Sequence, residues 1–149
     1  MLWKGGPGGL AKPVASPVTN ADDGASFALA DFNQDGLLDL VVAQFNGVAL
    51  FAGNGDCTFA LAGELASDGT AISVLAADFN ADGVVDLAVA NGLAYGVKIF
   101  LGSGGGGFQP ALELSSGGRG YMRDLAAADL NNDGALDLAA ACDAGLVAG

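Results

Sequence analysis

The chain has 149 residues, which fits one ordinary domain, and its 52% apolar and 15% charged residues exclude a disordered chain. No apolar stretch reaches the ~18 residues that a transmembrane helix needs. The formal net charge of −12 argues against nucleic acid and anionic membranes as partners and favours metal cations. Histidine is absent, which excludes Ser-His-Asp catalysis, Cys-His catalysis and the usual zinc sites.

Short strands separated by turn residues are predicted along the chain. Apolar or alternating runs end at Gly or Asn, and these breakers recur too often for helices of ordinary length. The predicted strands are 2–5, 10–18, 26–32, 37–42, 48–52, a run from 59, 72–79, 84–89, 97–101, a run from 108, 121–130 and 135–140. The Gly-rich run 102–107 is predicted to be a hairpin turn, because a phosphate loop would lead into a helix and Phe108-Gln109-Pro110 starts none.

The chain repeats itself in three copies of one unit. The segments DFNQDGLLDL, DFNADGVVDL and DLNNDGALDL begin at Asp31, Asp78 and Asp129, which lie 47 and 51 residues apart. VALFAGNGDCTF from Val48 and VKIFLGSGGGGF from Val97 recur in the same order. Four short antiparallel strands in a unit of this length are typical of a β-propeller blade. We therefore predict an all-β chain with strands three and four of a split blade in 1–20, whole blades in 21–66 and 67–115, and strands one and two of a split blade in 116–149.

Each acidic segment places oxygen ligands on alternate residues. Side-chain oxygens stand at positions 1, 3, 5 and 9, Gly stands at position 6, and the carbonyl of position 7 adds a fifth oxygen. Two carboxylates ~4 Å apart repel by about 4 kcal/mol at an effective dielectric near 20, unless a cation lies between them. Oxygen ligands without His or Cys select Ca²⁺, with Mg²⁺ second. The predicted ligands of three calcium ions are Asp31, Asn33, Asp35, Leu37, Asp39, Asp78, Asn80, Asp82, Val84, Asp86, Asp129, Asn131, Asp133, Ala135 and Asp137.

With these residues the unit resembles the FG-GAP/VCBS repeat of integrin-α-like propellers, and the likeness covers nearly the whole chain. The loop is not an EF-hand, because position 12 is Val42, Val89 or Ala140 where an EF-hand has Glu. The resemblance implies that the acidic loop joins the first two strands of a blade and binds calcium. It also implies that the ligand site lies on the face opposite the calcium loops. Family members include adhesion receptors, lectins and accessory domains of secreted proteins.

Two classes of function fit these observations, and a third stays open. The first is a calcium-stabilised, non-enzymatic binding module that recognises glycan or protein on a propeller face. The second is a propeller enzyme domain, against which the absence of His and of an acid/base pair outside the loops argues. The third is a structural or accessory segment of a larger secreted protein. Loops without a Glu clamp suggest weak calcium affinity, which favours a secreted or cell-surface location.

The strand order leads to an expectation about assembly. Leu2-Trp3-Lys4-Gly5 matches Leu50-Phe51-Ala52-Gly53, so the chain is expected to begin with third and fourth strands and to end with first and second strands. Three blades cannot close a ring that needs ~4–8. We therefore expect a head-to-tail homodimer with six blades, and the alternative is that the chain is part of a longer propeller.

Overall fold

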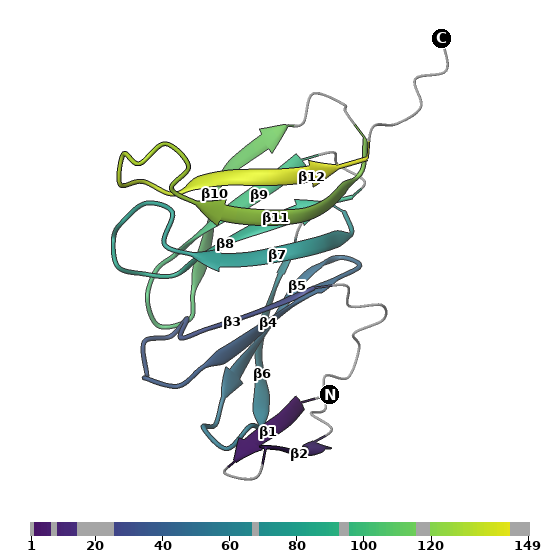
Figure 1. Cartoon of the computed structure of the whole chain (residues 1–149), viewed down its shortest axis with the longest axis vertical. Helices are drawn as coiled ribbons and strands as arrows, with labels where there is room; N and C mark the ends of the chain where they lie inside the picture. Colours follow the sequence, from purple (N-terminus) through teal and green to yellow (C-terminus); the bar gives the residue numbers. More distant parts are fainter. Residues whose placement is uncertain are drawn as a thin grey trace.

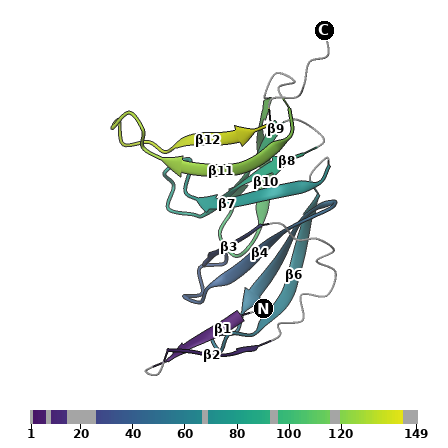
Figure 2. The same ribbon diagram turned by 45° about the vertical axis from the view of Figure 1, so that its right-hand side comes forward.

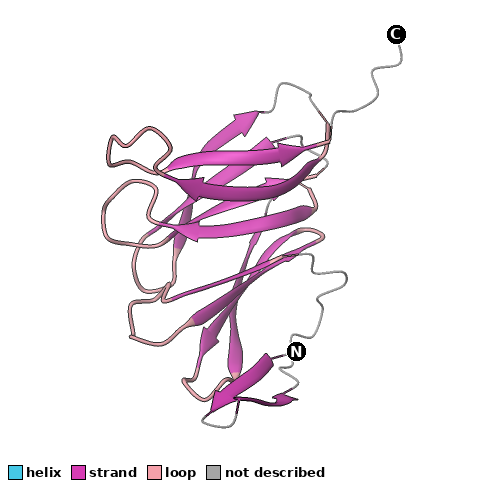
Figure 3. Cartoon of the chain, in the orientation of Figure 1, coloured by secondary structure: helices cyan, strands magenta, loops and turns pink. Residues whose placement is uncertain are grey.

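The computed structural model describes residues 2–6, 9–14, 26–66, 69–92, 96–115 and 120–143. Within these ranges every regular element is a β-strand (Figure 3). No helix in them is long and apolar enough to cross a membrane. The strands are β1 (Leu2–Gly6), β2 (Gly9–Val14), β3 (Phe27–Ala30), β4 (Asp39–Gln44), β5 (Gly47–Gly53), β6 (Phe59–Ala66), β7 (Ala71–Ala77), β8 (Asp86–Asn91), β9 (Gly96–Gly102), β10 (Phe108–Ser115), β11 (Met122–Ala128) and β12 (Asp137–Cys142). Residues 15–18 of one predicted strand lie outside the described residues.

These strands form two whole four-stranded sheets and two hairpins. The sheets have the orders β3-β4-β5-β6 and β7-β8-β9-β10, and β1-β2 and β11-β12 are two-stranded (Figure 1). All neighbours are antiparallel. The prediction of an all-β chain of four-stranded antiparallel units is thereby confirmed. Below, the two four-stranded sheets are called the first and second blades, and β11–β12 is called the third hairpin.

The second strand of each unit begins later than predicted. It starts at Asp39, Asp86 and Asp137, each the ninth position of its loop, instead of at the seventh. The seventh residue still belongs to the turn, because its N–H donates to the aspartate at position 5. The Gly-rich turn prediction is confirmed, since β9 ends at Gly102 and β10 begins at Phe108.

The hairpins that follow the loops share an irregularity. In β5–β6 the register shifts by one residue between Leu50 and Phe51, with the extra residue on β6. The β9–β10 hairpin has the same shift, with the extra residue on β10. The β1–β2 hairpin also shifts by one residue, between Trp3 and Gly5, with the extra residue on β2. The bulge position is common to β5–β6 and β9–β10, which indicates that these two hairpins are copies of one structural element, whereas the shift in β1–β2 lies one residue further along its first strand.

The two blades and β11–β12 stack face to face in chain order, and β1–β2 lies at the opposite end of the molecule from β11–β12 (Figures 1 and 2). Successive side chains of a strand point to opposite faces, so the middle strands contribute to two interfaces at once. Val41 of β4 packs with Leu87 of β8 in the core between the first and second blades. Ala88, the next residue of β8, packs with Met122 and Leu125 between the second blade and the third hairpin. Each blade is therefore held by its neighbours.

Hydrogen bonds between first strands reinforce this stacking. The N–H of Val74 donates to Ser26 Oγ at 3.2 Å, which links β7 to the segment before β3. Ser73 Oγ donates to Asp124 Oδ1 at 3.0 Å, which links β7 to β11. Ser26, Ser73 and Asp124 stand at the same position of the repeat, five residues before the loop. Side chains at this one repeat position therefore link the first strands of neighbouring units by hydrogen bonds.

Candidate metal centre

Each acidic segment folds into a loop between the first and second strands of its unit. In the first blade, Asp31 at position 1 accepts two hydrogen bonds from the far side of the loop. The N–H of Asp35 donates to its Oδ1 at 3.1 Å and the N–H of Gly36 donates to its Oδ2 at 2.8 Å. Asp78 and Asp129 accept the same pair of bonds in the other two loops. The first aspartate therefore points into the loop that it begins.

Positions 3 and 5 also turn toward each other. Asn33 Oδ1 accepts from the N–H of Asp35 at 2.8 Å, and Asn33 Nδ2 donates to Asp35 Oδ2 at 2.9 Å. Asp35 Oδ1 accepts from the N–H of Leu37 at 2.8 Å. The second and third loops repeat all of these contacts. The side chains at positions 1, 3 and 5 are thus gathered by one set of backbone contacts in all three loops.

The loop needs left-handed backbone at two positions. Gly36, Gly83 and Gly134 at position 6 have φ of 86°, 84° and 90°, as the sequence predicts for a sharp turn. Position 4 is also left-handed, with φ of 61° at Gln34 and 59° at Ala81. Side chains other than Gly, Asn and Asp tolerate this conformation at a cost of roughly 1–2 kcal/mol. The fold of the loop therefore stores strain that its hydrogen bonds must offset.

The ninth position has a different environment. Asp86 is completely buried, and its two oxygens accept from the N–H of Phe79 at 2.9 Å and from the N–H of Gly102 at 2.8 Å. Asp39 is also buried and accepts from Phe32 and Gly53 in the same way. This aspartate therefore joins the loop to the end of the third strand of its blade.

A glycine is required where the third strand ends. A Cβ on Gly53 would lie 2.0 Å from the carbonyl oxygen of Leu38, and one on Gly102 would lie 2.4 Å from that of Val85. Both distances are far below van der Waals contact. The close approach brings the glycine N–H to the ninth aspartate. These glycines are not among the site residues predicted from the sequence, although their recurrence in VALFAG and VKIFLG is the signal that marks them.

The third loop differs at its ninth position. Asp137 is half-buried, and its Oδ2 accepts from the N–H of Leu130 at 3.0 Å. Within the described residues it accepts no bond from a third strand, since β12 has β11 as its one neighbour there.

Hydrogen bonds from the Ala135 N–H and the Asn131 amide hold the pKa of Asp133 below its usual range. The loop therefore keeps an ionised carboxylate at position 5 at mildly acidic pH.

Neighbouring blades contact each other through these loops. The N–H of Gly106, in the Gly-rich turn of the second blade, donates to the carbonyl of Phe32 in the first loop at 3.1 Å. Gly104, Gly105 and Gly106 have φ between 70° and 79°, so side chains would strain the turn. These three glycines thus allow the turn to lie against the loop of the preceding blade.

The oxygen donors of each loop are of the type that hard cations prefer. No group of three or more Asp, Glu, His or Cys side chains is close enough to hold a metal in the described part of the chain. Asn at position 3 supplies an amide oxygen between two carboxylates, so each loop gathers three oxygen-bearing side chains of which two are acidic. A carboxylate oxygen that accepts one hydrogen bond keeps a second lone pair. Among the described residues the carboxylates at positions 1, 5 and 9 therefore do not form one metal-holding group, and the oxygens gathered at positions 1, 3 and 5 are of the hard type that calcium prefers.

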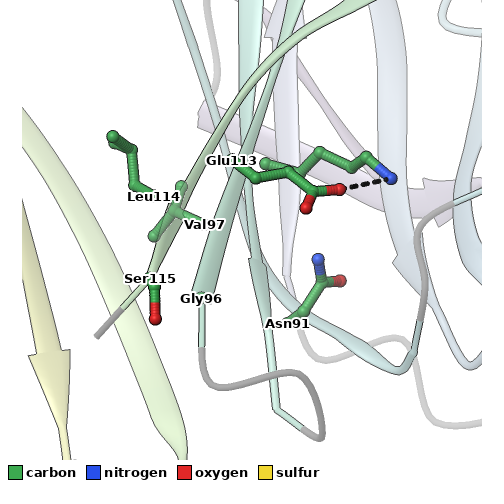
Figure 4. A pocket seen from close by; sticks show the side chains of 7 residues that line it. Asn91, Gly96, Val97, Glu113, Leu114 and Ser115 are labelled. Atoms are coloured by element: carbon green, nitrogen blue, oxygen red, sulfur yellow. Dashed lines mark ion pairs between the residues drawn. The ribbon is translucent and has the colours of Figure 1, made fainter. Parts of the chain in front are cut away.

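A second feature lies at the end of the second blade away from its acidic loop. It is a half-open cavity of about 330 Å³ (Figure 4). The side chain of Asn91 is buried, and its Oδ1 has no hydrogen-bond partner among the residues that the structure describes. In Figure 4 its amide points toward the ion pair of Lys98 Nζ and Glu113 Oε1, which are 3.2 Å apart. The lining residues are Asn91, Gly96, Val97, Lys98, Glu113, Leu114 and Ser115.

The first blade has a cavity of about 310 Å³ at the equivalent place. Its lining includes Gln44, Gly47 and Glu64, which stand where the second blade has Asn91, Gly96 and Glu113. Ala49 replaces Lys98, so the first cavity has no matching ion pair. Each blade therefore has an opening at this end, and that of the second blade carries the richer set of polar groups.

A comparison with protein-family models matches the chain to the FG-GAP-like repeat. The match covers residues 31–89 and 78–140, so it includes all three acidic loops. The chain belongs to the FG-GAP-like repeat family. Repeats of this family often bind Ca²⁺ and generally serve as binding or structural propeller segments. No curated protein matches the chain in sequence.

Proposed function

We propose that this FG-GAP repeat chain is a calcium-stabilised, non-enzymatic binding module of the cell surface or the secreted space. The single observation that supports it best is the threefold recurrence of the same loop contacts in three acidic loops. A lone turn rich in Asp and Asn would be explained by solvation. Three turns with the same inward-facing oxygens are better explained by a shared ligand.

Calcium would be held by side-chain oxygens at positions 1, 3, 5 and 9 and by the carbonyl of position 7. The ion supplies positive charge that offsets the three carboxylates of a loop, and three ions would reduce the formal net charge from −12 to −6. Asp39 and Asp86 would join the ion to the blade, because they already hold the third strand. Five protein oxygens leave little room for an open coordination position, which supports a structural role over a catalytic one.

Calorimetry with calcium or EDTA tests the metal. Calcium at 100-fold excess over Kd should stabilise the fold by about 2.7 kcal/mol per site. Asp35→Ala should remove one bound ion by elemental analysis, whereas Gln34→Ala, at the neighbouring position that supplies no ligand, should keep all three. An unchanged melting temperature in EDTA together with absence of bound calcium would refute the proposal.

The cavity of the second blade is the best candidate for a ligand site. The Asn91 Oδ1 offers a ligand an acceptor, Lys98 offers a donor and Glu113 offers an acceptor, which matches the alternating donors and acceptors of a sugar hydroxyl cluster. A glycan array in calcium tests this idea. Glu113→Gln should weaken a bound glycan, whereas Glu64→Gln in the equivalent cavity of the first blade should not. Binding to no glycan would favour a protein ligand or a structural segment.

The location and the absence of catalysis are parts of the same proposal. Weak calcium sites are occupied where calcium is abundant, which favours the outside of the cell. A screen for hydrolase activity that resists EDTA tests the non-enzymatic assignment, and a positive result that follows the purified chain would overturn it. If EDTA abolishes ligand binding and the fold at the same concentration, that result would support a structural role for calcium.

A further inference from the structure

The sequence contains three Asn-Gly pairs, and each lies in or beside a turn between strands. They are Asn46-Gly47, Asn54-Gly55 and Asn91-Gly92. Glycine has no Cβ, so its backbone nitrogen can approach the side-chain carbonyl of the asparagine before it. Such a pair reacts with itself when the asparagine is open to solvent, the glycine N–H is not engaged in a hydrogen bond, and no β-ladder holds the glycine backbone. These three conditions separate the three pairs.

The Asn91-Gly92 pair is protected by burial. Asn91 is 4% exposed, and the N–H of Gly92 donates to the carbonyl of Thr70 at 3.0 Å. A Cβ on Gly92 would lie 2.4 Å from Cδ1 of Ile72, so the backbone is closely packed there. The attacking nitrogen is therefore occupied, and the asparagine that it would attack is shielded from water.

The Asn46-Gly47 pair is protected by the sheet. Asn46 is exposed in the turn between β4 and β5, but Gly47 is buried and belongs to β5. Gly47 stands opposite Gln44 of β4 on one side and opposite Ala66 of β6 on the other. An attack by its nitrogen would require the backbone to leave both ladders. This pair therefore meets only the first of the three conditions.

The Asn54-Gly55 pair meets all three conditions. Both residues are exposed and lie between β5, which ends at Gly53, and β6, which begins at Phe59. The N–H of Gly55 donates no hydrogen bond to any residue that the structure describes. The φ of Gly55 is 77°, a left-handed value that glycine adopts without strain. The attacking nitrogen is thus accessible and unengaged.

We propose that Asn54 is a site of spontaneous chemical modification, at which the folded chain deamidates itself, whereas Asn46 and Asn91 stay intact. The backbone nitrogen of Gly55 attacks Cγ of Asn54 and forms a new carbon–nitrogen bond. The Cγ–Nδ2 bond breaks, and Nδ2 leaves as ammonia with the proton that the Gly55 nitrogen loses. Water then opens the cyclic imide at either carbonyl, which gives aspartate or an isoaspartyl linkage. This inference goes beyond the proposed function and depends on neither calcium nor a ligand.

The reaction changes the hydrogen bonds of the turn. The N–H of Asn54 donates to the carbonyl of Thr58 at 3.0 Å, and Asn54 Nδ2 donates to Thr58 Oγ1 at 2.9 Å. Thr58 Oγ1 in turn donates to Asp56 Oδ1 at 2.5 Å. Loss of Nδ2 as ammonia removes the second of these bonds. An isoaspartyl linkage also places an additional carbon in the backbone that the first bond closes.

The turn has little space for that additional carbon. A Cβ on Gly53 would lie 2.0 Å from the Leu38 carbonyl oxygen, and one on Gly55 would lie 3.1 Å from Cδ2 of Leu37. The N–H of Gly53 donates to Asp39 Oδ1 at 2.9 Å and so joins the third strand to the first acidic loop. Conversion to the isoaspartyl form should therefore disturb this junction and lower the melting temperature of the chain.

Prolonged incubation of the 149-residue chain at mildly alkaline pH tests the site. Tandem mass spectrometry locates each exchange of an amide NH2 for OH, and far-ultraviolet circular dichroism shows that the chain stays folded. The folded chain should convert at Asn54 and not at Asn46 or Asn91. In guanidinium chloride all three should convert, because unfolding removes the protection. A folded chain whose Asn54 stays intact while the unfolded chain reacts, or whose Asn46 or Asn91 converts as fast as Asn54, would overturn the proposal.

Two variants at position 54 are matched controls. Asn54→Ser removes the reacting amide at an exposed position, so the folded variant should show no conversion and no change in melting temperature on incubation. Asn54→Asp has the charge of one product without the additional backbone carbon. Incubated wild-type chain should therefore melt below Asn54→Asp. Equal melting temperatures would show that the isoaspartyl linkage leaves the turn undisturbed, and the structural consequence proposed for it would be wrong.

Discussion

Positions 5 and 9 of the loop have different structural roles, and this difference leads to a quantitative prediction for the second blade. Asp86→Ala leaves the N–H groups of Phe79 and Gly102 buried without an acceptor. Each buried donor without a partner costs roughly 1–3 kcal/mol, so the variant should lose about 4 kcal/mol of unfolding free energy even without calcium. Asp82→Ala also removes two bonds, but its partners are at an exposed loop where water replaces it, so it should lose less than about 1 kcal/mol.

Urea unfolding of both variants in EDTA and again in calcium separates the two roles. Calcium at 100-fold excess over Kd should increase the loss of unfolding free energy of Asp82→Ala, relative to the wild-type chain, by about 2.7 kcal/mol, because that variant no longer holds the ion. The Asp86→Ala variant should have a lower unfolding free energy than Asp82→Ala in both buffers. If the two variants are equally stable in EDTA, or if Asp86→Ala loses less than Asp82→Ala there, the architectural role of the ninth aspartate is wrong.

Further predictions concern the glycines and the third hairpin. Gly53→Ala should lower the unfolding free energy by about 3 kcal/mol in thermal unfolding, because its Cβ would lie 2.0 Å from the Leu38 carbonyl. Gly36→Ala meets no atom within 4 Å and should cost only the left-handed φ, about 1 kcal/mol. The side chain of Arg123 donates to Asp143 and lowers the pKa of that carboxyl, which a carbon-13 NMR titration should detect and Arg123→Gln should abolish. A lowered folded-state pKa means that the pair stabilises the hairpin above the ordinary pKa of Asp, and that this stabilisation is lost as the pH falls through the lowered value.

Much of the blade could be predicted from sequence because two local signals agree. Alternating apolar runs between Gly and Asn predict strands, and oxygen-bearing residues at every second position predict an ion-binding loop. At Gly36 the prediction succeeds, since a glycine at position 6 of the motif predicts the positive φ that the residue has. Gln34 and Ala81 show where it stops. Their left-handed backbone carries no sequence signal, because it is imposed by the bonds that positions 1 and 3 make across the loop.

The role of the ninth aspartate depends on tertiary contacts. The sequence predicts Asp86 as one more ligand, equivalent to the others. The structure shows it completely buried, because the third strand of its own blade approaches the loop and presents the N–H of Gly102. That approach depends on a chain segment sixteen residues later. Spacing within the ten-residue motif carries no information about it.

The contact between the Gly-rich turn of one blade and the acidic loop of the blade before it couples that loop to the packing of the two blades. The N–H of Gly106 is bonded to the Phe32 carbonyl inside the first loop, so an ion that orders that loop also fixes the docking surface of the second blade. By reciprocity, a docked second blade must raise the affinity of the first loop by the same factor. The calcium affinity of the first loop should therefore depend on whether the second blade is docked. On chelation the blades should come apart from one another before their individual sheets melt.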